Sequence, residues 1–269
     1  MYCSQSLFRG SGEIFLLLLL LLSSSSAISI SSSRQSAIKS ASNHFTSLKP
    51  TSGLFEIELP LTSQINKMGS GSLADSIEIE NLQISFALDL KTELSKKTGS
   101  NVKLLCPFGS SKRFLTASKS STLKSLNLKL PPPPNPFMSL FSKPPPLPPP
   151  PKIENTILII ITPNSDRDYL TSTYLSLSTP TILINGYLKT PSSVKASKWI
   201  YHLKPLTNLG MISGYLLNEG KGFECVNTDG KVLKKFEDED ILVGDSSTPD
   251  LREAVGLAQK DMDDKINNK

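Results

Sequence analysis

The fold is decided by two short runs of sequence, TILIIIT at residues 156–162 and TILIN at residues 181–185. Each run is a continuous series of β-branched and aliphatic residues, which is typical of a strand covered on both faces. The segment between them, residues 166–178, has the length of a crossover helix. A strand, a helix and a second strand in this order predict two neighbouring parallel strands of an α/β sheet.

The sequence before these runs predicts the same alternation. Residues 55–59 (FEIEL) alternate apolar and charged side chains, which predicts a half-buried strand. Apolar residues then recur at helical spacing across residues 79–94, which predicts a helix that ends near Gly99. Residues 102–106 (VKLLC) predict the next strand, which Pro107 stops.

A basic segment and a proline-rich segment follow this strand. Residues 111–126 favour a further, basic helix. Residues 131–151 hold more than half of the chain's 20 prolines. Because proline lacks an amide hydrogen and fixes φ, this stretch is excluded from sheets and helices. We expect an extended loop that interrupts one sheet, since neither half of the chain alone has enough strands to close a core.

The C-terminal part predicts shorter, antiparallel strands. They comprise residues 199–203, residues 212–217, and a hairpin of residues 222–226 and 231–236. The sequence NTDG at residues 227–230 supplies the turn of that hairpin. Thr248 and Pro249 predict the N-cap and first residue of a closing helix. Its apolar stripe is Leu251, Ala254, Val255, Ala258 and Met262.

Together these patterns predict an α/β fold. We expect a mostly parallel central sheet flanked by helices, which ends in an antiparallel strand meander and a C-terminal helix. A single domain is expected over residues 54–269, in which residues 127–153 form a proline-rich insert loop. The chain before it is expected to be a disordered leader of two parts, residues 1–27 and residues 28–53.

The first part of the leader has the features of a secretory signal peptide. Arg9 precedes an apolar run that contains seven leucines at residues 16–22, and Ser25 and Ala27 take the −3 and −1 positions of a cleavage site. The run is shorter than the roughly 18 apolar residues of a membrane span. We therefore expect no transmembrane span in the mature protein.

The second part of the leader has the composition of an organelle transit peptide. Residues 28–53 are rich in serine, carry Arg34, Lys39 and Lys49, and contain no Asp or Glu. A signal peptide followed by a transit peptide is the two-part address of plastids that are bounded by extra membranes. We expect localisation to the plastid (chloroplast), with a secreted protein that has a serine-rich N-terminus as the alternative.

Positive charge is concentrated in one interval of the chain. No acidic residue lies between Glu93 and Glu154, whereas ten Lys or Arg residues do. This asymmetry predicts a surface that meets a protein partner or an anionic thylakoid membrane surface, although lysines that keep a loop soluble explain it equally well. Part of the net charge of +5 lies in the leader, so no nucleic-acid partner is expected. The candidate surface residues are Lys112, Arg113, Lys119, Lys124 and Lys129.

Cysteines are sparse. Cys106 and Cys225 remain once the leader is removed, and they lie in different predicted strands. Two cysteines do not make a disulfide scaffold, and a chain of this length can bury a core without one. We expect free buried thiols, with a redox-active pair as the alternative.

The motifs of common active sites are missing from the sequence. Neither G-x-x-x-x-G-K-[ST] nor G-x-G-x-x-G follows a predicted strand, which disfavours the usual nucleotide sites. Without the leader, His202 is the only histidine, so paired metal ligands are missing, and no G-x-S-x-G elbow presents a nucleophile. We expect no metal, no cofactor and no catalytic residue, which favours a protein that is not an enzyme.

Residues 199–206 (WIYHLKPL) gather the only tryptophan with a histidine, a tyrosine and a lysine. We interpret this cluster as a strand at the change from parallel to antiparallel sheet. Its side chains are expected to alternate between core and rim, and Pro205 is expected to end it.

Polar residues follow the two buried strands: Thr162-Pro163-Asn164 after the first and Asn185-Gly186 after the second. Open α/β sheets place their ligands at the carboxyl ends of parallel strands. An enzyme or a nucleotide- or metabolite-binding domain is therefore the alternative function, although ordinary turns explain the same residues. The sequence KPPPLPPPPK at residues 143–152 also matches polyproline ligands, so an adaptor outside the plastid is a further alternative, with a spacer as the simpler interpretation.

Several segments carry a family resemblance in their shared order: FEIELPL (residues 55–61), ISFALDL (84–90), VKLLCPFG (102–109), ILIIITPN (157–164), TILINGYL (181–188), IYHLKPL (200–206) and GYLLNEGKGFECV (214–226). Together they resemble a plastid family described mainly as a domain of unknown function. The family includes the low photosystem II accumulation assembly factors and the C-terminal region of a chloroplast adenylate-kinase-like protein.

The resemblance implies a structural signature and no catalytic residues, because the family has none established. The signature residues are Pro163, Asn185, Trp199, Tyr201, His202, Leu203 and Pro205. Together with the missing motifs, it predicts a non-enzymatic plastid protein, an assembly or interaction factor associated with the thylakoid or photosystem.

Overall fold

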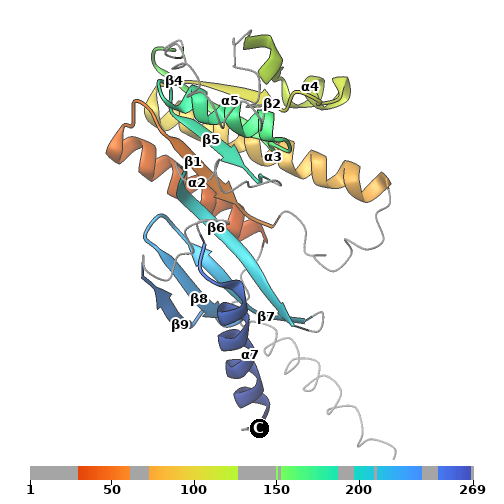
Figure 1. Cartoon of the computed structure of the whole chain (residues 1–269), viewed down its shortest axis with the longest axis vertical. Helices are drawn as coiled ribbons and strands as arrows, with labels where there is room; N and C mark the ends of the chain where they lie inside the picture. The colour runs from red at the N-terminus through yellow and green to blue at the C-terminus, as the bar shows by residue number, and fades with distance from the viewer. Residues whose placement is uncertain are drawn as a thin grey trace, which may run out of the picture.

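The computed structural model describes residues 30–60, 73–126, 150, 153–186, 197–208, 211–237 and 248–267. Its helices are α2 (Ile30–Leu48), α3 (Leu73–Thr98), α4 (Lys112–Ser118), the 3-10 helix η2 (Leu123–Leu126), α5 (Asp166–Ser176) and α7 (Leu251–Asn267) (Figure 1). Its strands are β1 (Leu54–Glu58), β2 (Asn101–Cys106), β3 (Ser121–Thr122), β4 (Thr156–Ile161), β5 (Thr181–Ile184), β6 (Ser197–Asn208), β7 (Met211–Asn218), β8 (Phe223–Asn227) and β9 (Val232–Phe236).

All of these strands belong to one sheet in the order β3-β2-β4-β5-β1-β6-β7-β8-β9. Neighbours from β3 to β6 are parallel, and neighbours from β6 to β9 are antiparallel. The predicted fold class, a mostly parallel α/β sheet that ends in an antiparallel meander and a C-terminal helix, is confirmed. β2 and β4 flank the proline-rich segment and are neighbours, so that segment interrupts one sheet.

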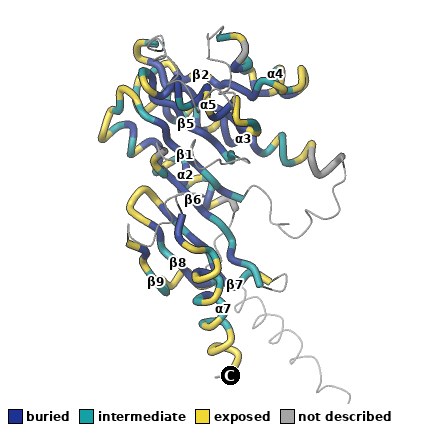
Figure 2. Tube along the Cα trace, viewed as in Figure 1, coloured by how far each residue is buried: buried dark blue, intermediate teal, exposed yellow. Residues whose placement is uncertain are grey.

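Helices cover the sheet on both faces (Figure 1). α2 and α3 pack on one face, over apolar side chains from five parallel strands. α5 packs on the other face of the parallel half, and α7 packs on that same face of the antiparallel half. Figure 2 shows the parallel strands almost entirely buried, whereas the last turns of α7 are exposed. β4 and β5 are buried along their whole length, as their continuous apolar runs predict.

β1 is more buried than its alternating sequence predicts. It lies between β5 and β6, and both of its faces are covered. Phe55 and Ile57 point into the core as expected, but Glu56 on the opposite face is only 4% exposed. The expectation of a half-buried strand is therefore wrong, because alternation of residue types does not reveal that a second layer covers the polar side.

The predicted basic helix over residues 111–126 is also only partly correct. The Ser111 side chain caps α4 by accepting a hydrogen bond from the Phe114 amide, but α4 ends at Ser118. Lys119 then adopts a left-handed conformation with φ of 49°, which turns the chain into β3 and η2.

The segment predicted to be a disordered transit peptide forms helix α2. Ala37, Ala41 and Phe45 of α2 are buried in the main core, and Arg34 pairs with Asp89 of α3 at 3.2 Å. The prediction that the folded domain begins at residue 54 is therefore wrong, because α2 supplies one layer of the fold. Small and hydroxylated side chains allow this helix to lie close to the sheet, and the same composition resembles a transit peptide.

α7 closes the antiparallel half of the sheet. Its buried residues Ala254 and Ala258 belong to the predicted apolar stripe. The helix begins at Leu251, and the Asp250 carboxylate accepts a hydrogen bond from the Arg252 amide, so the predicted cap at Thr248 is wrong by two residues.

Some predictions fall outside the described residues. They are the signal peptide at residues 1–27, Lys129, and the proline-rich stretch apart from Pro150. Among the helices that are described, none combines the length and the apolar character needed to cross a membrane.

Candidate functional site

The carboxyl end of β4, where the sequence predicts a ligand site, is joined to the carboxyl end of β2 by the buried carboxylate of Asp168. One carboxylate oxygen accepts a hydrogen bond from the Phe108 amide at 3.0 Å. The other accepts hydrogen bonds from the Asn164 amide, the Ser165 amide and the Ser165 hydroxyl at 2.6 to 3.2 Å. Ser165 and Asp168 form a capping box at the start of α5. Both oxygens of the Asp168 carboxylate are therefore occupied by hydrogen bonds that hold these segments together.

The second predicted ligand segment, Asn185-Gly186 after β5, is also occupied by structural contacts. Asn185 has a φ of 48°, and its side-chain oxygen accepts a hydrogen bond from the Leu59 amide at 2.9 Å. A side chain on Gly186 would collide with the hydroxyl group of Tyr169, which is buried beneath it. Both residues therefore shape a turn that holds β1, β5 and α5 together.

The WIYHLKPL segment lies in β6, which has β1 as its parallel neighbour and β7 as its antiparallel neighbour. The predicted change of sheet type at this strand is confirmed. Tyr201 and Leu203 point into the core beneath α2, whereas Trp199 lies in the core beneath α7. A bulge in the pairing with β1 at Ile200 places Trp199 and His202 on the same face.

His202 is buried in an aromatic and acidic setting. Its ring stands edge-on to Trp199, with ring centroids 4.7 Å apart, and to Phe223, with centroids 5.3 Å apart. Its Nδ1 atom lies 3.7 Å from the Glu58 carboxylate. At 1% exposure the ring cannot touch a ligand in solution, so the geometry supports a packing role.

Pro205 does not end the strand as predicted. It pairs with Tyr215, and β6 continues to Asn208. β1 extends only to the position opposite His202, so no strand from the described part of the chain pairs with Pro205 on that side. The missing amide hydrogen of proline therefore costs no ladder hydrogen bond there.

The candidate basic residues that the structure describes lie in α4 or in the segment that follows it, after the carboxyl end of β2. Lys112 and Lys119 are exposed, and within the part of the chain that the structure describes they have no ion-pair partner. Arg113 instead pairs with Glu80 of α3. Lys124 lies in η2. We call Lys112, Arg113 and Lys119 the α4 surface.

The two cysteines are buried and free. Cys106 in β2 and Cys225 in β8 are six strand positions apart, which corresponds to about 29 Å at the usual strand spacing. A disulfide requires Cα atoms within about 7 Å, so these cysteines cannot pair within one molecule. Burial raises the pKa of Cys106, although hydrogen bonds with Ser120 and Ser118 oppose the shift, and burial raises the pKa of Cys225 to about 11.

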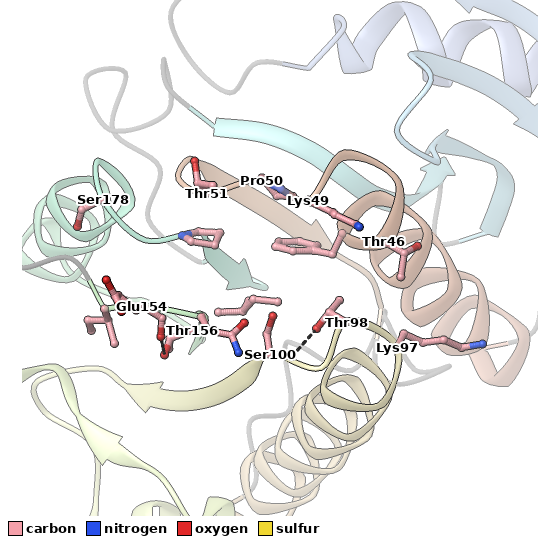
Figure 3. Close-up of a pocket in the computed structure, with 15 residues that line it drawn as sticks. Thr46, Lys49, Pro50, Thr51, Lys97, Thr98, Ser100, Glu154, Thr156 and Ser178 are labelled. Carbon is pink, nitrogen blue, oxygen red and sulfur yellow. Dashed lines mark hydrogen bonds between the residues drawn. The ribbon is translucent and has the colours of Figure 1, made fainter.

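A pocket of about 560 Å³ lies at the opposite, amino edge of the parallel strands. It is bounded by the ends of α2 and α3 and by the turns that lead into β4 and β5 (Figure 3). Its rim carries three charged side chains, Lys49, Lys97 and Glu154. In Figure 3 the two lysines lie on the side of the helix ends, whereas Glu154 lies on the opposite wall.

The pocket walls are rich in hydroxyl groups. Thr46, Thr98 and Thr156 each donate a hydrogen bond of 2.7 to 3.0 Å to a carbonyl of their own backbone segment. The Thr98 oxygen also accepts a hydrogen bond of 3.1 Å from the Ser100 amide. Since a hydroxyl oxygen has two lone pairs, each of the three oxygens keeps at least one as an acceptor. The buried side chains of Phe45 and Ile157 add apolar surface.

Sequence reasoning missed this pocket because it places ligands at the carboxyl ends of strands. The residues that line it lie at the ends of two helices, at the start of β4 or in the turns before strands, and they are spread over about half of the chain. The sequence signal that was available is the pair of lysines directly at two helix ends, Lys97 and Lys49.

Because α2 belongs to the fold, the folded protein has a second histidine, His44, in the segment that the sequence predicts to be part of the leader. His44 contacts Phe45 and Phe55, and burial and the nearby charge of Lys198 lower its pKa. Across the described residues, no three His, Cys, Asp or Glu side chains are grouped so as to hold a metal ion.

Comparison with known proteins adds no relative: no family model, curated protein or solved structure matches the chain.

Proposed function

We propose that this chain is a non-enzymatic interaction factor that contacts its partner through the α4 surface. The proposal rests on the hydrogen bonds of the polar side chains at the carboxyl edge of the sheet. There the Asp168 carboxylate and the Asn185 side chain are engaged by backbone amides, so these two polar groups are committed to structure.

The exposed lysines beside that edge supply a contact of a different kind. Lys112 begins the short helix α4 and Lys119 caps its end, and Phe114 anchors this helix in the core. Lysines near an anionic membrane contribute about 1 kcal/mol each, which is too little for stable attachment by two residues. An acidic surface of a protein partner, which adds shape complementarity, is therefore the favoured target.

The resemblance to photosystem assembly factors supports a partner at the thylakoid, and the sequence of the leader supports entry through a signal peptide with the plastid as destination. Because α2 is part of the core, any import signal within residues 30–48 has to stay attached to the folded protein. A cleavage after Ala27 removes one basic and one acidic residue, Arg9 and Glu13, and leaves the net charge at +5.

A pelleting assay with anionic vesicles tests the choice of partner. We expect weak binding of the full-length chain that salt abolishes, and no stable membrane attachment. Tight, salt-insensitive pelleting would contradict the electrostatic contact. The control for the double change Lys112→Glu/Lys119→Glu is Arg252→Glu/Lys260→Glu, on exposed positions of α7. If the wild type pellets tightly and only the α4 variant loses binding, the membrane is the partner.

A further inference from the structure

We propose that the pocket at the amino edge of the sheet binds a small polyhydroxylated anion, a sugar acid or a sugar phosphate. The pocket lies across the sheet from the α4 surface, so this binding is a property separate from the interaction proposed above. Its volume of about 560 Å³ is within the range of small-molecule sites.

The hydroxyl-rich walls determine which ligand groups they accept. The hydroxyl protons of Thr46, Thr98 and Thr156 are held by backbone carbonyls, so these groups present oxygen lone pairs to the pocket. A wall of acceptors requires a ligand with several donors, and a polyol provides them without a positive charge.

The two lysines determine the charge of the ligand. Lys49 follows the last residue of α2, and Lys97 lies in the last turn of α3. Both residues lie on the same side of the pocket in Figure 3, where the Lys97 ammonium group points outward. Lys97 is exposed and is held only loosely, 3.9 Å from the half-buried Glu93 carboxylate, so it can turn to a ligand. Two ammonium donors on one side favour a carboxylate or a phosphate at that end of the ligand.

The opposite wall limits the anion to one end. Glu154 stands there, and its carboxylate repels a second negative charge but accepts hydrogen bonds from hydroxyl groups. Between the two charged ends, Phe45, Ile157 and Pro180 give an apolar floor. The C–H groups of a sugar ring fit such a floor, whereas inorganic phosphate has neither C–H groups for the floor nor several hydroxyl donors for Glu154.

Isothermal titration calorimetry on the full-length chain tests the proposal, with glucuronate, glucose 6-phosphate, glucose and inorganic phosphate as probes. We expect saturable binding of at least one of the two anionic sugars, roughly tenfold tighter than binding of glucose or phosphate. Lys97→Gln and Lys49→Gln should each weaken it by about three- to tenfold. Lys96→Gln, one residue away on the same exposed helix end, is the matched control and should leave it unchanged.

Three results would overturn the proposal. The first is the lack of saturable binding of both anionic sugars to a chain whose circular dichroism confirms that it is folded. The second is phosphate binding as tight as that of glucose 6-phosphate, which would remove the role of the hydroxyl groups. The third is an equal loss of affinity in Lys96→Gln and Lys97→Gln, which would mean that binding depends on the overall positive charge and not on a specific contact.

Discussion

The hydroxyl group of Ser40 in α2 donates a hydrogen bond of 2.8 Å to the carbonyl oxygen of Ile200 in β6. The two residues are 160 positions apart, and this bond joins a helix near the N-terminus to the strand at which the sheet changes type. A segment with the composition of an address peptide is thus tied to the middle of the fold.

A first prediction concerns truncation of the N-terminal region. A chain that starts at residue 28 should fold, whereas a chain that starts at residue 54 should not, because it lacks α2 and exposes the apolar face beneath it. Within the full-length chain, Phe45→Ala should cost about 3–5 kcal/mol of unfolding free energy. Circular dichroism and thermal melting measure both effects. A cooperative melt of the chain from residue 54 would refute the assignment of α2 to the core.

A second prediction concerns the buried carboxylate of Asp168. Asp168→Asn places an amide donor against backbone amides that are themselves donors, and should cost about 2–4 kcal/mol of unfolding free energy. Asp166→Asn, on an exposed position of the same helix turn, is the control and should cost about 0.5 kcal/mol or less. Urea denaturation compares the two. Equal costs would mean that the carboxylate is not needed to join these strands.

A third prediction separates packing from chemistry in the WIYHLKPL segment. Trp199→Ala removes an aromatic side chain from the core beneath α7 and should cost about 2–3 kcal/mol of stability. His202→Gln should lower the melting temperature modestly and leave binding of the partner unchanged. Loss of binding in His202→Gln without any loss of stability would indicate a functional histidine instead.

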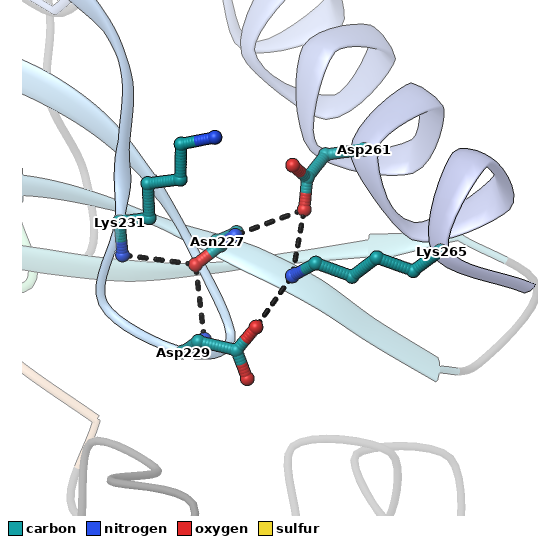
Figure 4. A network of polar contacts seen from close by, with 5 residues as sticks. All are labelled: Asn227, Asp229, Lys231, Asp261 and Lys265. Atoms are coloured by element: carbon teal, nitrogen blue, oxygen red, sulfur yellow. Dashed lines mark hydrogen bonds and ion pairs between the residues drawn. The ribbon is translucent and has the colours of Figure 1, made fainter. Parts of the chain in front are cut away.

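A fourth prediction concerns pH and the contacts between α7 and the hairpin turn (Figure 4). The ammonium group of Lys265 bonds to Asp261 and Asp229, and Asn227 also bonds to Asp261. The hydrogen bond with Lys265 lowers the pKa of Asp261, although partial burial opposes the shift. Ionised Asp261 therefore stabilises the fold above the ordinary carboxyl pKa, and this contribution is lost as the pH falls through the lowered value.

The same hydrogen bonds raise the pKa of Lys265, so its contribution is complete below the ordinary lysine pKa and is lost as the pH rises through the raised value. Lys265→Gln should cost about 0.5 kcal/mol near neutral pH, because the pairs are exposed. The difference from the wild type should shrink at both extremes of pH. Lys260→Gln, on the same helix, is the control and should have the same dependence of stability on pH as the wild type. If Lys265→Gln also had the same pH dependence as the wild type, these ion pairs would not contribute to stability.

A fifth prediction concerns the thiols. Burial and the raised pKa values of Cys106 and Cys225 should prevent both from reacting with a thiol reagent in the folded protein, whereas denaturation should expose both. The reaction should be the same with and without reductant. Rapid labelling of the folded chain at either position, or a disulfide between the two in a monomer, would be inconsistent with the fold.

Much of the sheet is predictable because its local patterns and its tertiary environment agree. β4 and β5 are continuous apolar runs, and the Asn227–Gly230 turn supplies both a side-chain acceptor and a residue with φ of 82°. Strands and turns that have an uninterrupted residue pattern could therefore be predicted from the sequence.

The features that escaped prediction depend on neighbours that are distant in the sequence. α2 packs through alanine, serine and one phenylalanine, so its buried face is hardly more apolar than an unfolded segment. β6 passes through Pro205 because β1 ends before it. The pocket is assembled from turns before two strands and from the ends of two helices, and no single window of sequence contains it.

The most direct test of the proposed function is affinity purification of the tagged full-length chain from its native organelle, compared with Lys112→Glu/Lys119→Glu and with the control Arg252→Glu/Lys260→Glu. We predict that the wild type and the control recover a defined thylakoid protein complex with photosystem subunits, and that the α4 variant, with an unchanged melting temperature, does not. Recovery of that complex by all three proteins would contradict the role of the α4 surface. Purification of the wild type without any photosystem subunit would contradict the assembly function itself.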